Sequence, residues 1–367
     1  MSLSLGIVGL PNVGKSTLFN ALLKTSQAQA SNYPFTTIEP NTGIVQVPDP
    51  RIDALAKIVQ PGKLVPATVE FWDIAGIIKG ASKGEGLGNQ FLANIRQASA
   101  LILVTRCFND ADVIHVNGVV DPVADLQTVL LELMLADLDT VSRGVERYRR
   151  AAKGGDKTAT GCLAFSEKLY AALEQGLLAS TVVPSSEVDE LTVQELQLMT
   201  TKPMLVVGNV DENELTRSAA ELYEKYNFSR VTSLERFLPL CAKVEAELAL
   251  LEAEEQKEFL ESYGLKESGL DRLAQTAYAL LNLRTYFTAG PIEVRAWTIP
   301  SGMDAQHAAG VIHTDFIKGF IRAETIGYSD YIAGNGESGA KEAGKLRLEG
   351  KEYIVHDGDV MHFRVGN

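Results

Sequence analysis

The sequence has few cysteines, few aromatic residues, no long apolar run and no excess of positive charge. Its three cysteines are far apart in 367 residues, which excludes a disulfide framework and favours a reducing compartment. The longest apolar runs, such as 100–104 and 204–207, are far shorter than the roughly 20 residues of a membrane span. The net charge of −13 disfavours a chain coated in nucleic acid or held on anionic lipid. We therefore expect a cytoplasmic protein with no membrane partner and no DNA partner.

Short apolar runs alternate with helical patterns over most of the chain. Several runs are almost continuous in Val, Ile and Leu and end at polar or glycine-rich turns, as parallel strands covered on both faces do. The runs lie at 5–10, 69–74, 101–106 and 204–209. This pattern predicts an α/β fold with a doubly wound, mostly parallel sheet.

The stretch between the last two runs is too long for ordinary βα units, so we expect an insertion there. Apolar residues step by three or four positions from Leu131 through Leu135 to Tyr148, which is a helical stripe. A glycine turn at 153–156 follows, and a second stripe begins at Leu163. Two such stripes favour an antiparallel helical hairpin over two ordinary core helices. Mixed strand and helix patterns then predict a small β domain after residue 280.

The segment 9–17, GLPNVGKST, fits the P-loop pattern in full. It follows an expected strand and precedes a helical run at 18–23, which is the context that the motif requires. The glycines let backbone N–H groups point at phosphates, and the helix N-terminus adds positive potential. We expect Lys15 to reach the β- and γ-phosphates and Ser16 to bind Mg²⁺.

Two further segments fit a γ-phosphate and its metal ion. Asp73 ends a strand-like run, where an acid opposite a P-loop can hold Mg²⁺ through its water shell, and Gly76 lets a backbone N–H approach the γ-phosphate. Thr36 and Thr37 follow the P-loop helix, and a hydroxyl there can complete the Mg²⁺ shell when the γ-phosphate is present. A threonine pair in a loop is, however, more often turn chemistry.

Asn209 ends the run at 204–209, where this kind of fold reads the base. A guanine reader commonly has Lys directly after the Asn and an Asp three residues after it, but this chain has Val210 and Glu212. Loss of a good bidentate pair removes about 1–3 kcal/mol of discrimination. An Asn amide can instead serve adenine, and the main chain of 241–243 could lie behind the base.

These residues, together with 33–37, 73–81 and 313–322, resemble the YchF branch of the Obg-like P-loop ATPases. The resemblance covers essentially the whole chain. It implies a nucleotide-binding domain at 1–122 and 203–280, an inserted coiled-coil arm at 123–202, and a C-terminal TGS domain with a ubiquitin-like β-grasp at 281–367. It also implies a preference for ATP over GTP, dependence on Mg²⁺ and association with ribosomes.

The resemblance also assigns roles to residues of the site. It implies Mg²⁺ ligands at Ser16 and Thr37 and contact of adenine with Asn209 and the backbone of Val210. The phosphates would be held by Asn12, Val13, Gly14, Lys15, Ser16 and Thr17.

Hydrolysis needs a side chain that orients the attacking water, and the position directly after Gly76, where many P-loop switches have one, does not provide it. Ile77 stands where many P-loop switches have Gln, and it cannot hydrogen-bond a water. His115 matches the place of a histidine in a loop of the family, where a neutral imidazole could position or deprotonate water. From sequence alone, a surface or capping histidine is the alternative. Asn12 could help to coordinate K⁺ beside the phosphates, or only shape the loop.

Three functions remain open from the sequence. The first is a slow ATPase whose nucleotide switches a ribosome-binding surface. The second is a ribosome- or RNA-binding module in which hydrolysis is incidental. The third is an Obg-like GTPase in which Asp211 or Glu212 still reads guanine.

Overall fold

The structure, a computed structural model, describes residues 4–30, 41–74, 87–110 and 120–366, which divide into two compact units. The first, here the P-loop unit, comprises Met1–Gly43 and Glu70–Leu270. The second, the C-terminal unit, comprises Ile44–Val69 and Asp271–Asn367. The sequence prediction placed 44–69 with the nucleotide-binding domain, whereas in the structure these residues group with the C-terminal unit. Within them, Pro50–Val59 and Lys63–Val65 contact C-terminal strands, while 44–46 and 68–69 belong to strands of the sheet that carries the P-loop.

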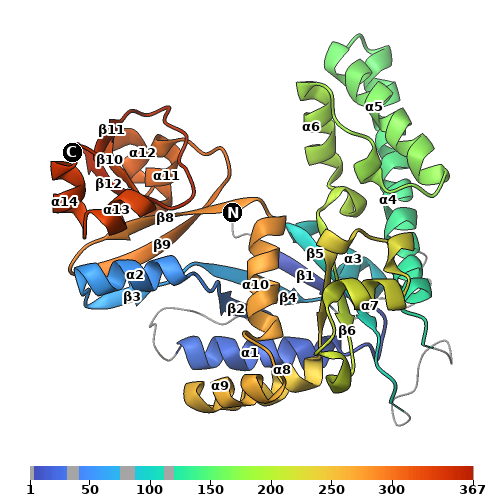
Figure 1. The fold of residues 1–367 in the computed structure, drawn as a ribbon. Coiled ribbons are helices and arrows are strands. Elements are labelled where there is room, and N and C mark those ends of the chain that lie inside the picture. Colours follow the sequence, from blue (N-terminus) through green and yellow to red (C-terminus); the bar gives the residue numbers. More distant parts are fainter. Residues whose placement is uncertain (1–3, 31–40, 75–86, 111–119, 367) are drawn as a thin grey trace. The chain divides into compact units, whose positions relative to one another are not determined.

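The sheet that carries the P-loop has the strand order β2-β4-β1-β5-β6-β7 (Figure 1). Its four pairings of β1 with β4, β1 with β5, β5 with β6, and β6 with β7 are all parallel. The strands are β1 (Ser4–Val8), β2 (Thr42–Gln46), β4 (Thr68–Asp73), β5 (Ala100–Arg106), β6 (Met204–Asn209) and β7 (Phe237–Leu240). β1, β5, β6 and β7 are buried along their whole length. The runs at 5–10, 101–106 and 204–209 predicted this for β1, β5 and β6, whereas β4, from the run at 69–74, is only partly buried.

Helices connect these strands, and the first follows the P-loop directly. The helices of this unit are α1 (Lys15–Ala30), α3 (Leu87–Gln97), α7 (Ala219–Lys225), α8 (Ala242–Leu248) and α9 (Ala253–Ser262). α10 (Gly269–Leu280) begins at the end of this unit, and its residues from Asp271 onward belong to the C-terminal unit. Short 3-10 turns lie at Ala179–Thr181, Met199–Thr201, Glu212–Glu214, Phe228–Arg230 and Leu234–Arg236. The parallel sheet with its helices confirms the predicted α/β class.

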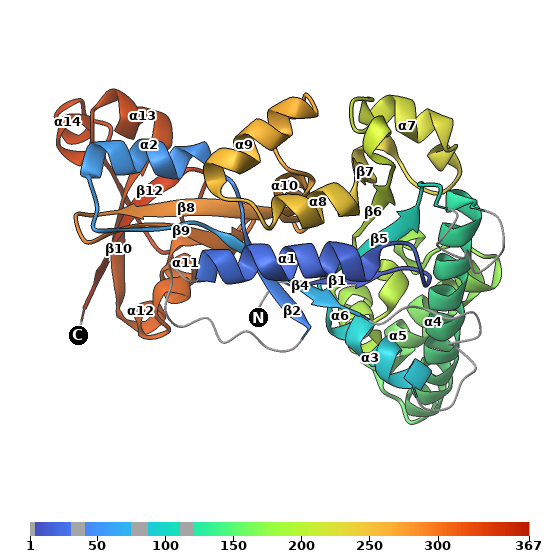
Figure 2. The same cartoon turned by 90° about the horizontal axis from the view of Figure 1, so that it is seen from below.

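The inserted helices lie between β5 and β6, as predicted, and form a hairpin with a third helix on it (Figures 1 and 2). They are α4 (Pro122–Lys153), α5 (Lys157–Glu174) and α6 (Glu187–Leu196). Gly155 turns the chain at a φ of 89°, and Asp156 caps α5 by accepting from the backbone N–H of Ala159. Val141 and Tyr148 of α4 pack on Phe165 of α5 in one apolar core.

One part of the predicted stripe is wrong. Leu131 and Leu135 are 51% and 37% exposed, whereas Val129 and Leu133 are buried. The buried residues of α4 step by three or four positions along its length and form one stripe: Leu126, Val129, Leu133, Asp137, Val141, Val145 and Tyr148. The prediction chose neighbouring leucines on another face in the first half of the helix, and it passed over the buried Asp137.

The C-terminal unit has its own sheet, in the order β11-β10-β12-β8-β9-β3. β8 pairs with β9 and β10 with β12 in antiparallel fashion, while β8 and β12 are parallel at Val360 and Phe287. Its elements are α2 (Pro50–Val59), β3 (Lys63–Val65), β8 (Leu283–Ala289), β9 (Glu293–Pro300), α11 (Ala305–Ile312), α12 (Asp315–Gly319), β10 (Phe320–Gly327), α13 (Tyr328–Ala333), α14 (Glu337–Glu342), β11 (Arg347–Glu349) and β12 (Asp359–Val365). Two antiparallel strand pairs joined by a parallel central pair, with α11 against them, form the β-grasp that the resemblance implied.

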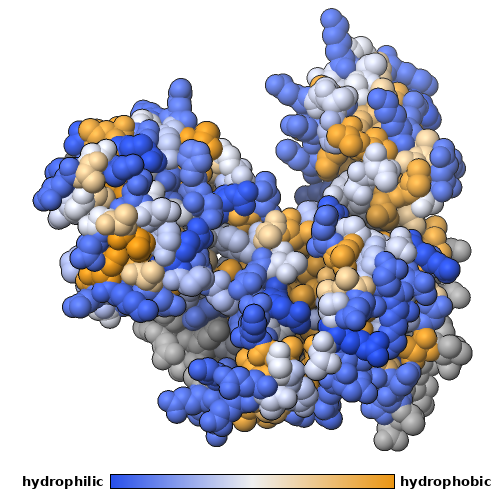
Figure 3. Space-filling model, in the orientation of Figure 1, coloured by the Kyte–Doolittle hydropathy of each residue, from blue (hydrophilic) through white to orange (hydrophobic). Residues whose placement is uncertain are grey.

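Apolar side chains are interspersed with hydrophilic ones over the visible face of the molecule (Figure 3). Within the described residues, no helix combines the length and the apolar character needed to cross a membrane.

Candidate nucleotide-binding site

The P-loop connects the end of β1 to the start of α1, and its glycines are required by close contacts. Gly14 has a φ of 96°, and a Cβ there would lie 2.2 Å from the side-chain nitrogen of Asn209. A Cβ on Gly9 would lie 2.4 Å from the carbonyl oxygen of Val104 in β5. Asn12 also has a positive φ, of 62°. Larger residues at the two glycines would therefore displace the loop from the strands that support it.

Lys15 is buried under this loop, with 7% of its surface exposed. Its ammonium group donates to the carbonyl oxygen of Leu10 at 2.7 Å, so the lysine holds its own loop closed. Burial lowers the pKa of Lys15 to about 8, and the charge of Asp73 opposes this shift. Burial likewise raises the pKa of Asp73, and Lys15 partly counters it. The two predicted phosphate and metal residues are therefore brought into electrostatic contact.

Ser16 and Thr17 form the first turn of α1 and are exposed. The backbone N–H of Leu18 donates to the carbonyl oxygen of Gly14 at 3.0 Å, which starts the helix directly at the loop. Val13 is buried, with 1% of its surface exposed. The hydroxyls of Ser16 and Thr17 consequently lie at the positive end of a helix of 16 residues.

Asn209 braces the P-loop from β6. It is 5% exposed, and its side-chain nitrogen donates to the carbonyl oxygen of Val13 at 2.9 Å. Its side-chain oxygen accepts from the backbone N–H of Ala242 at 2.9 Å. The backbone N–H of Val210 donates to the carbonyl oxygen of Leu240, also at 2.9 Å. The ends of β6 and β7 and the P-loop are thus joined through one amide, a role that the sequence reasoning missed.

The carboxylate that would read guanine has other partners. Glu212 accepts from the ammonium of Lys243 and, at 3.4 Å, from the hydroxyl of Tyr263. The hydrogen bond from Lys243 is the main cause that lowers the pKa of Glu212 below its ordinary value. Asp211 accepts from the backbone N–H of Asn109 at 3.2 Å. Both acids after Asn209 are therefore engaged by protein groups.

A buried network behind the base-reading loop also escaped the sequence analysis. The hydroxyl oxygen of Tyr226 lies 2.7 Å from the carbonyl oxygen of Cys107 and 2.6 Å from a carboxylate oxygen of Glu214, so its one proton can donate to either acceptor, and Lys225 forms an ion pair with Glu214. Glu214 is 6% exposed. An acid in a run of acids gives no signal of burial, so this network could not have been found from the sequence.

Five of the residues discussed as site candidates lie outside the described residues. They are Thr36, Thr37, Gly76, Ile77 and His115. Their roles stay predictions.

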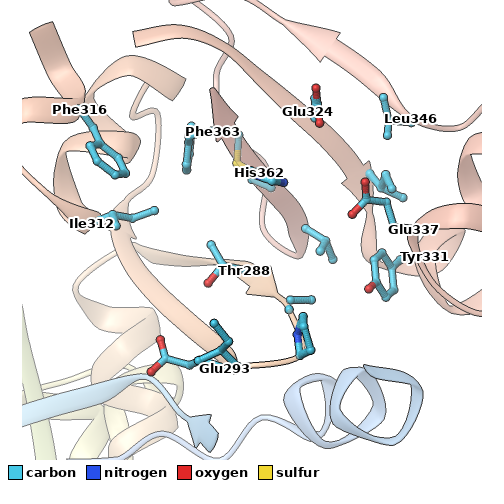
Figure 4. A pocket seen from close by; sticks show the side chains of 17 residues that line it. Thr288, Glu293, Ile312, Phe316, Glu324, Tyr331, Glu337, Leu346, His362 and Phe363 are labelled. Carbon is cyan, nitrogen blue, oxygen red and sulfur yellow. The ribbon is translucent and has the colours of Figure 1, made fainter. Parts of the chain in front are cut away.

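The C-terminal unit contains a separate cavity of about 420 Å³ (Figure 4). Phe316 and Phe363 line one side of it, and Glu293, Glu324 and Glu337 contribute carboxylates from three elements. Its described lining residues include no Lys or Arg. Such a surface repels phosphates, so the P-loop remains the candidate site for a nucleotide.

Comparisons with known proteins find relatives over the whole chain. Residues 4–135 match a family model described as "50S ribosome-binding GTPase", and residues 283–366 match the YchF C-terminal domain, described as a "Protein of unknown function (DUF933)". The chain is 53% identical to the ribosome-binding ATPase YchF of Haemophilus influenzae and 53% identical to that of Bacillus subtilis, each over 365 residues and 99% of both chains.

A solved structure extends the similarity to three dimensions. It is titled as the YchF GTPase of Schizosaccharomyces pombe and is 37% identical in sequence, with a TM-score of 0.87 over 99% of this chain and 98% of that one. Identity of this size over both full lengths leaves one conclusion: the chain belongs to the YchF family.

Proposed function

We propose that this chain binds and hydrolyses ATP at residues 9–17 and acts as a nucleotide-dependent switch that associates with the ribosome in the cytoplasm. The observation that supports it most is the complete P-loop, in which the buried ammonium of Lys15 is in electrostatic contact with Asp73. The relatives from Haemophilus influenzae and Bacillus subtilis are described as ribosome-binding ATPases, and they match this chain over its whole length, whereas the Schizosaccharomyces pombe relative is described as a GTPase.

Selection of adenine follows from the groups around Asn209. Guanine recognition needs a free carboxylate for N1–H and the exocyclic amine, and Glu212 is hydrogen-bonded to Lys243 and Tyr263 instead. Recognition of adenine does not require a carboxylate at this position. We assign base contact to Asn209 and the backbone of Val210. Because the Asn209 amide is bonded to Val13 and Ala242, and the N–H of Val210 to Leu240, such contact requires these groups to share or exchange their partners. We expect ATP to displace GTP from a shared site.

Mg²⁺ fits the donors of this site. Ser16 offers an exposed hydroxyl and Asp73 a carboxylate, both hard oxygen ligands, and Mg²⁺ commonly takes few protein ligands beside phosphates. Among the described residues no cluster of three His, Cys, Asp or Glu side chains could hold a metal by itself, in keeping with a metal that arrives with the nucleotide. Mg²⁺ would neutralise charge on the phosphates, with Thr37 as a further ligand.

We assign the phosphate contacts to the P-loop itself. Backbone N–H groups of Asn12–Thr17 would hold the phosphates, and Lys15 would exchange the carbonyl oxygen of Leu10 for phosphate oxygens. Gly76 would bring a further N–H to the γ-phosphate. Asn12 is assigned to K⁺ coordination, and equal turnover in Na⁺ and K⁺ buffers would refute that assignment.

Water activation is assigned to His115, since Ile77 cannot hydrogen-bond a water. In the His115→Ala variant, turnover should fall steeply while the Kd for ATP barely changes, because the imidazole contacts water and not the nucleotide. Unchanged turnover would remove His115 from the mechanism. The alternative of a ribosome-binding module with incidental hydrolysis predicts that ribosomes leave turnover unchanged, whereas the proposed switch predicts that they stimulate it.

A further inference from the structure

The segment between β2 and β4, residues 47–67, belongs to a different unit from the P-loop. β2 and β4 are neighbours in the P-loop sheet, but the chain between them forms α2 and β3 of the C-terminal unit. We call this segment the crossover. Its ends are joined, because the backbone N–H of Val47 donates to the carbonyl oxygen of Ala67 at 2.8 Å.

The crossover is built into the C-terminal unit as one of its elements. β3 is the edge strand of that sheet and pairs in parallel with β9, from Lys63 opposite Glu293 to Val65 opposite Arg295. The backbone N–H of Gly62 adds a hydrogen bond of 3.0 Å to the carbonyl oxygen of Pro291. α2 buries Ile52 and Leu55, which are 4% and 0% exposed, and packs on β8 and β9. The segment is therefore a structural part of that unit and not a surface loop.

Arg51 fastens the crossover at its first helical turn. Its guanidinium donates to Asp357 at 2.7 Å and to Asp49 at 2.7 Å, and it lies 5.2 Å from the ring centroid of Phe287 in β8. The other carboxylate oxygen of Asp357 accepts from the backbone N–H of Thr285 at 2.8 Å. One planar group thus ties the crossover to β8 and to the loop before β12, a geometry that Lys cannot reproduce.

The other end of the same two strands faces the nucleotide site. Thr37, an expected Mg²⁺ ligand, precedes β2, and Asp73 is the last residue of β4. The backbone N–H of Asp73 donates to the carbonyl oxygen of Asn41 at 3.0 Å. β2 and β4 are therefore joined by hydrogen bonds at both ends, beside the metal residue and again where the crossover begins.

We infer that the crossover transmits the nucleotide state of the P-loop to the C-terminal unit, with Arg51 as the positioning residue that fixes it there. This inference rests on the proposed function. A γ-phosphate that changes the segments beside Thr37 and Asp73 acts on strands that continue into α2 and β3. Coupling of this kind is reciprocal, so a change at Arg51 must alter the relative affinities for ATP and ADP.

The test measures the Kd values of a non-hydrolysable ATP analogue and of ADP for the wild type and three variants. Arg51→Met should change the ratio of the two Kd values at least about fivefold, the lower end of typical couplings. Arg51→Lys should give an intermediate change. Arg347→Met is the control, because Arg347 also binds several partners in this unit (Glu349 and Tyr353) but none in the crossover. A ratio in Arg51→Met that equals the wild-type ratio would overturn the inference.

If Arg51→Met does not fold, hydrogen exchange in the wild type tests the inference without a variant. Amides of 50–65 should exchange at different rates in the ATP-analogue and ADP states, and identical rates would overturn the inference. The experiment distinguishes failure of this inference from failure of the proposed function. If the proposed function is wrong, the wild type binds neither nucleotide and no ratio of Kd values can be measured.

Discussion

Replacing Asn209 with Ala tests whether its amide supports the P-loop as the structure indicates. The side chain is 5% exposed and makes two hydrogen bonds of 2.9 Å, to the carbonyl oxygen of Val13 and from the N–H of Ala242. A buried group left without a partner costs about 1–3 kcal/mol. The two groups together should lower the free energy of unfolding by about 2–6 kcal/mol.

The assay can follow the P-loop unit alone. The chain has two tryptophans, Trp72 in β4 and Trp297 in β9, so a Trp297→Phe background leaves fluorescence from the sheet that carries the P-loop. Urea titration in this background gives the midpoint and slope of that transition. Asn209→Asp keeps the acceptor for Ala242 but places a carboxylate against the carbonyl of Val13, so we expect it to be destabilised too.

The outcomes separate two roles. If Asn209 only contacts the base, Asn209→Ala weakens ATP binding and leaves unfolding unchanged within about 0.5 kcal/mol, the spread of ordinary surface substitutions. That result would refute the bracing role. Loss of both stability and affinity supports it.

Three more outcomes are expected from single sites. The pKa of Lys15 is lowered to about 8, so ATP affinity should fall by up to about tenfold per pH unit above pH 8, and Lys15→Met should abolish that dependence, as calorimetric titration can show. The stability of the nucleotide-free chain should change in the opposite direction. Between pH 8 and the ordinary pKa of 10.5, Lys15 is protonated in the unfolded chain but not in the folded one, so its contribution to the free energy of unfolding rises with pH. Gly14→Ala should weaken ATP binding at least about tenfold, because a Cβ would lie 2.2 Å from Asn209 and φ is 96°, and unchanged affinity would contradict the geometry. Asp137→Ala should destabilise the arm by about 3 kcal/mol in thermal unfolding, since Met199 and Thr200 lose a buried acceptor. An unchanged unfolding temperature would contradict this.

The sequence predicted most of the P-loop sheet because its strands carry strong local signals. The runs at 101–106 and 204–209 correspond to β5 (Ala100–Arg106) and β6 (Met204–Asn209), since strands covered on both faces must be apolar throughout. The C-terminal unit was predicted only as a small β domain after residue 280. Its strand β8 has no continuous apolar run, because Arg284 and Thr285 interrupt it, and the backbone N–H of Thr285 finds its acceptor in Asp357, 72 positions away.

The membership of the crossover in the C-terminal unit could not be predicted either. Its attachment depends on Arg51 and Asp357, which are 306 positions apart, and on the pairing of a strand of three residues, β3, with β9. Local patterns contain no information on such partners. The same holds at the site, where the P-loop motif predicted Lys15 and Ser16, but only the folded chain shows that Asn209 braces Val13 and that Lys243 engages Glu212.

The measurement that tests the central claim most directly is a competition titration of ATP and GTP, with Mg²⁺, for one site on the purified chain. The account predicts that ATP displaces a fluorescent adenine nucleotide at much lower concentration than GTP, and that Lys15→Met binds both nucleotides more weakly than the wild type. A wild type that binds GTP more tightly than ATP would contradict the assignment of the base site, and one that binds neither nucleotide would contradict the function as a whole.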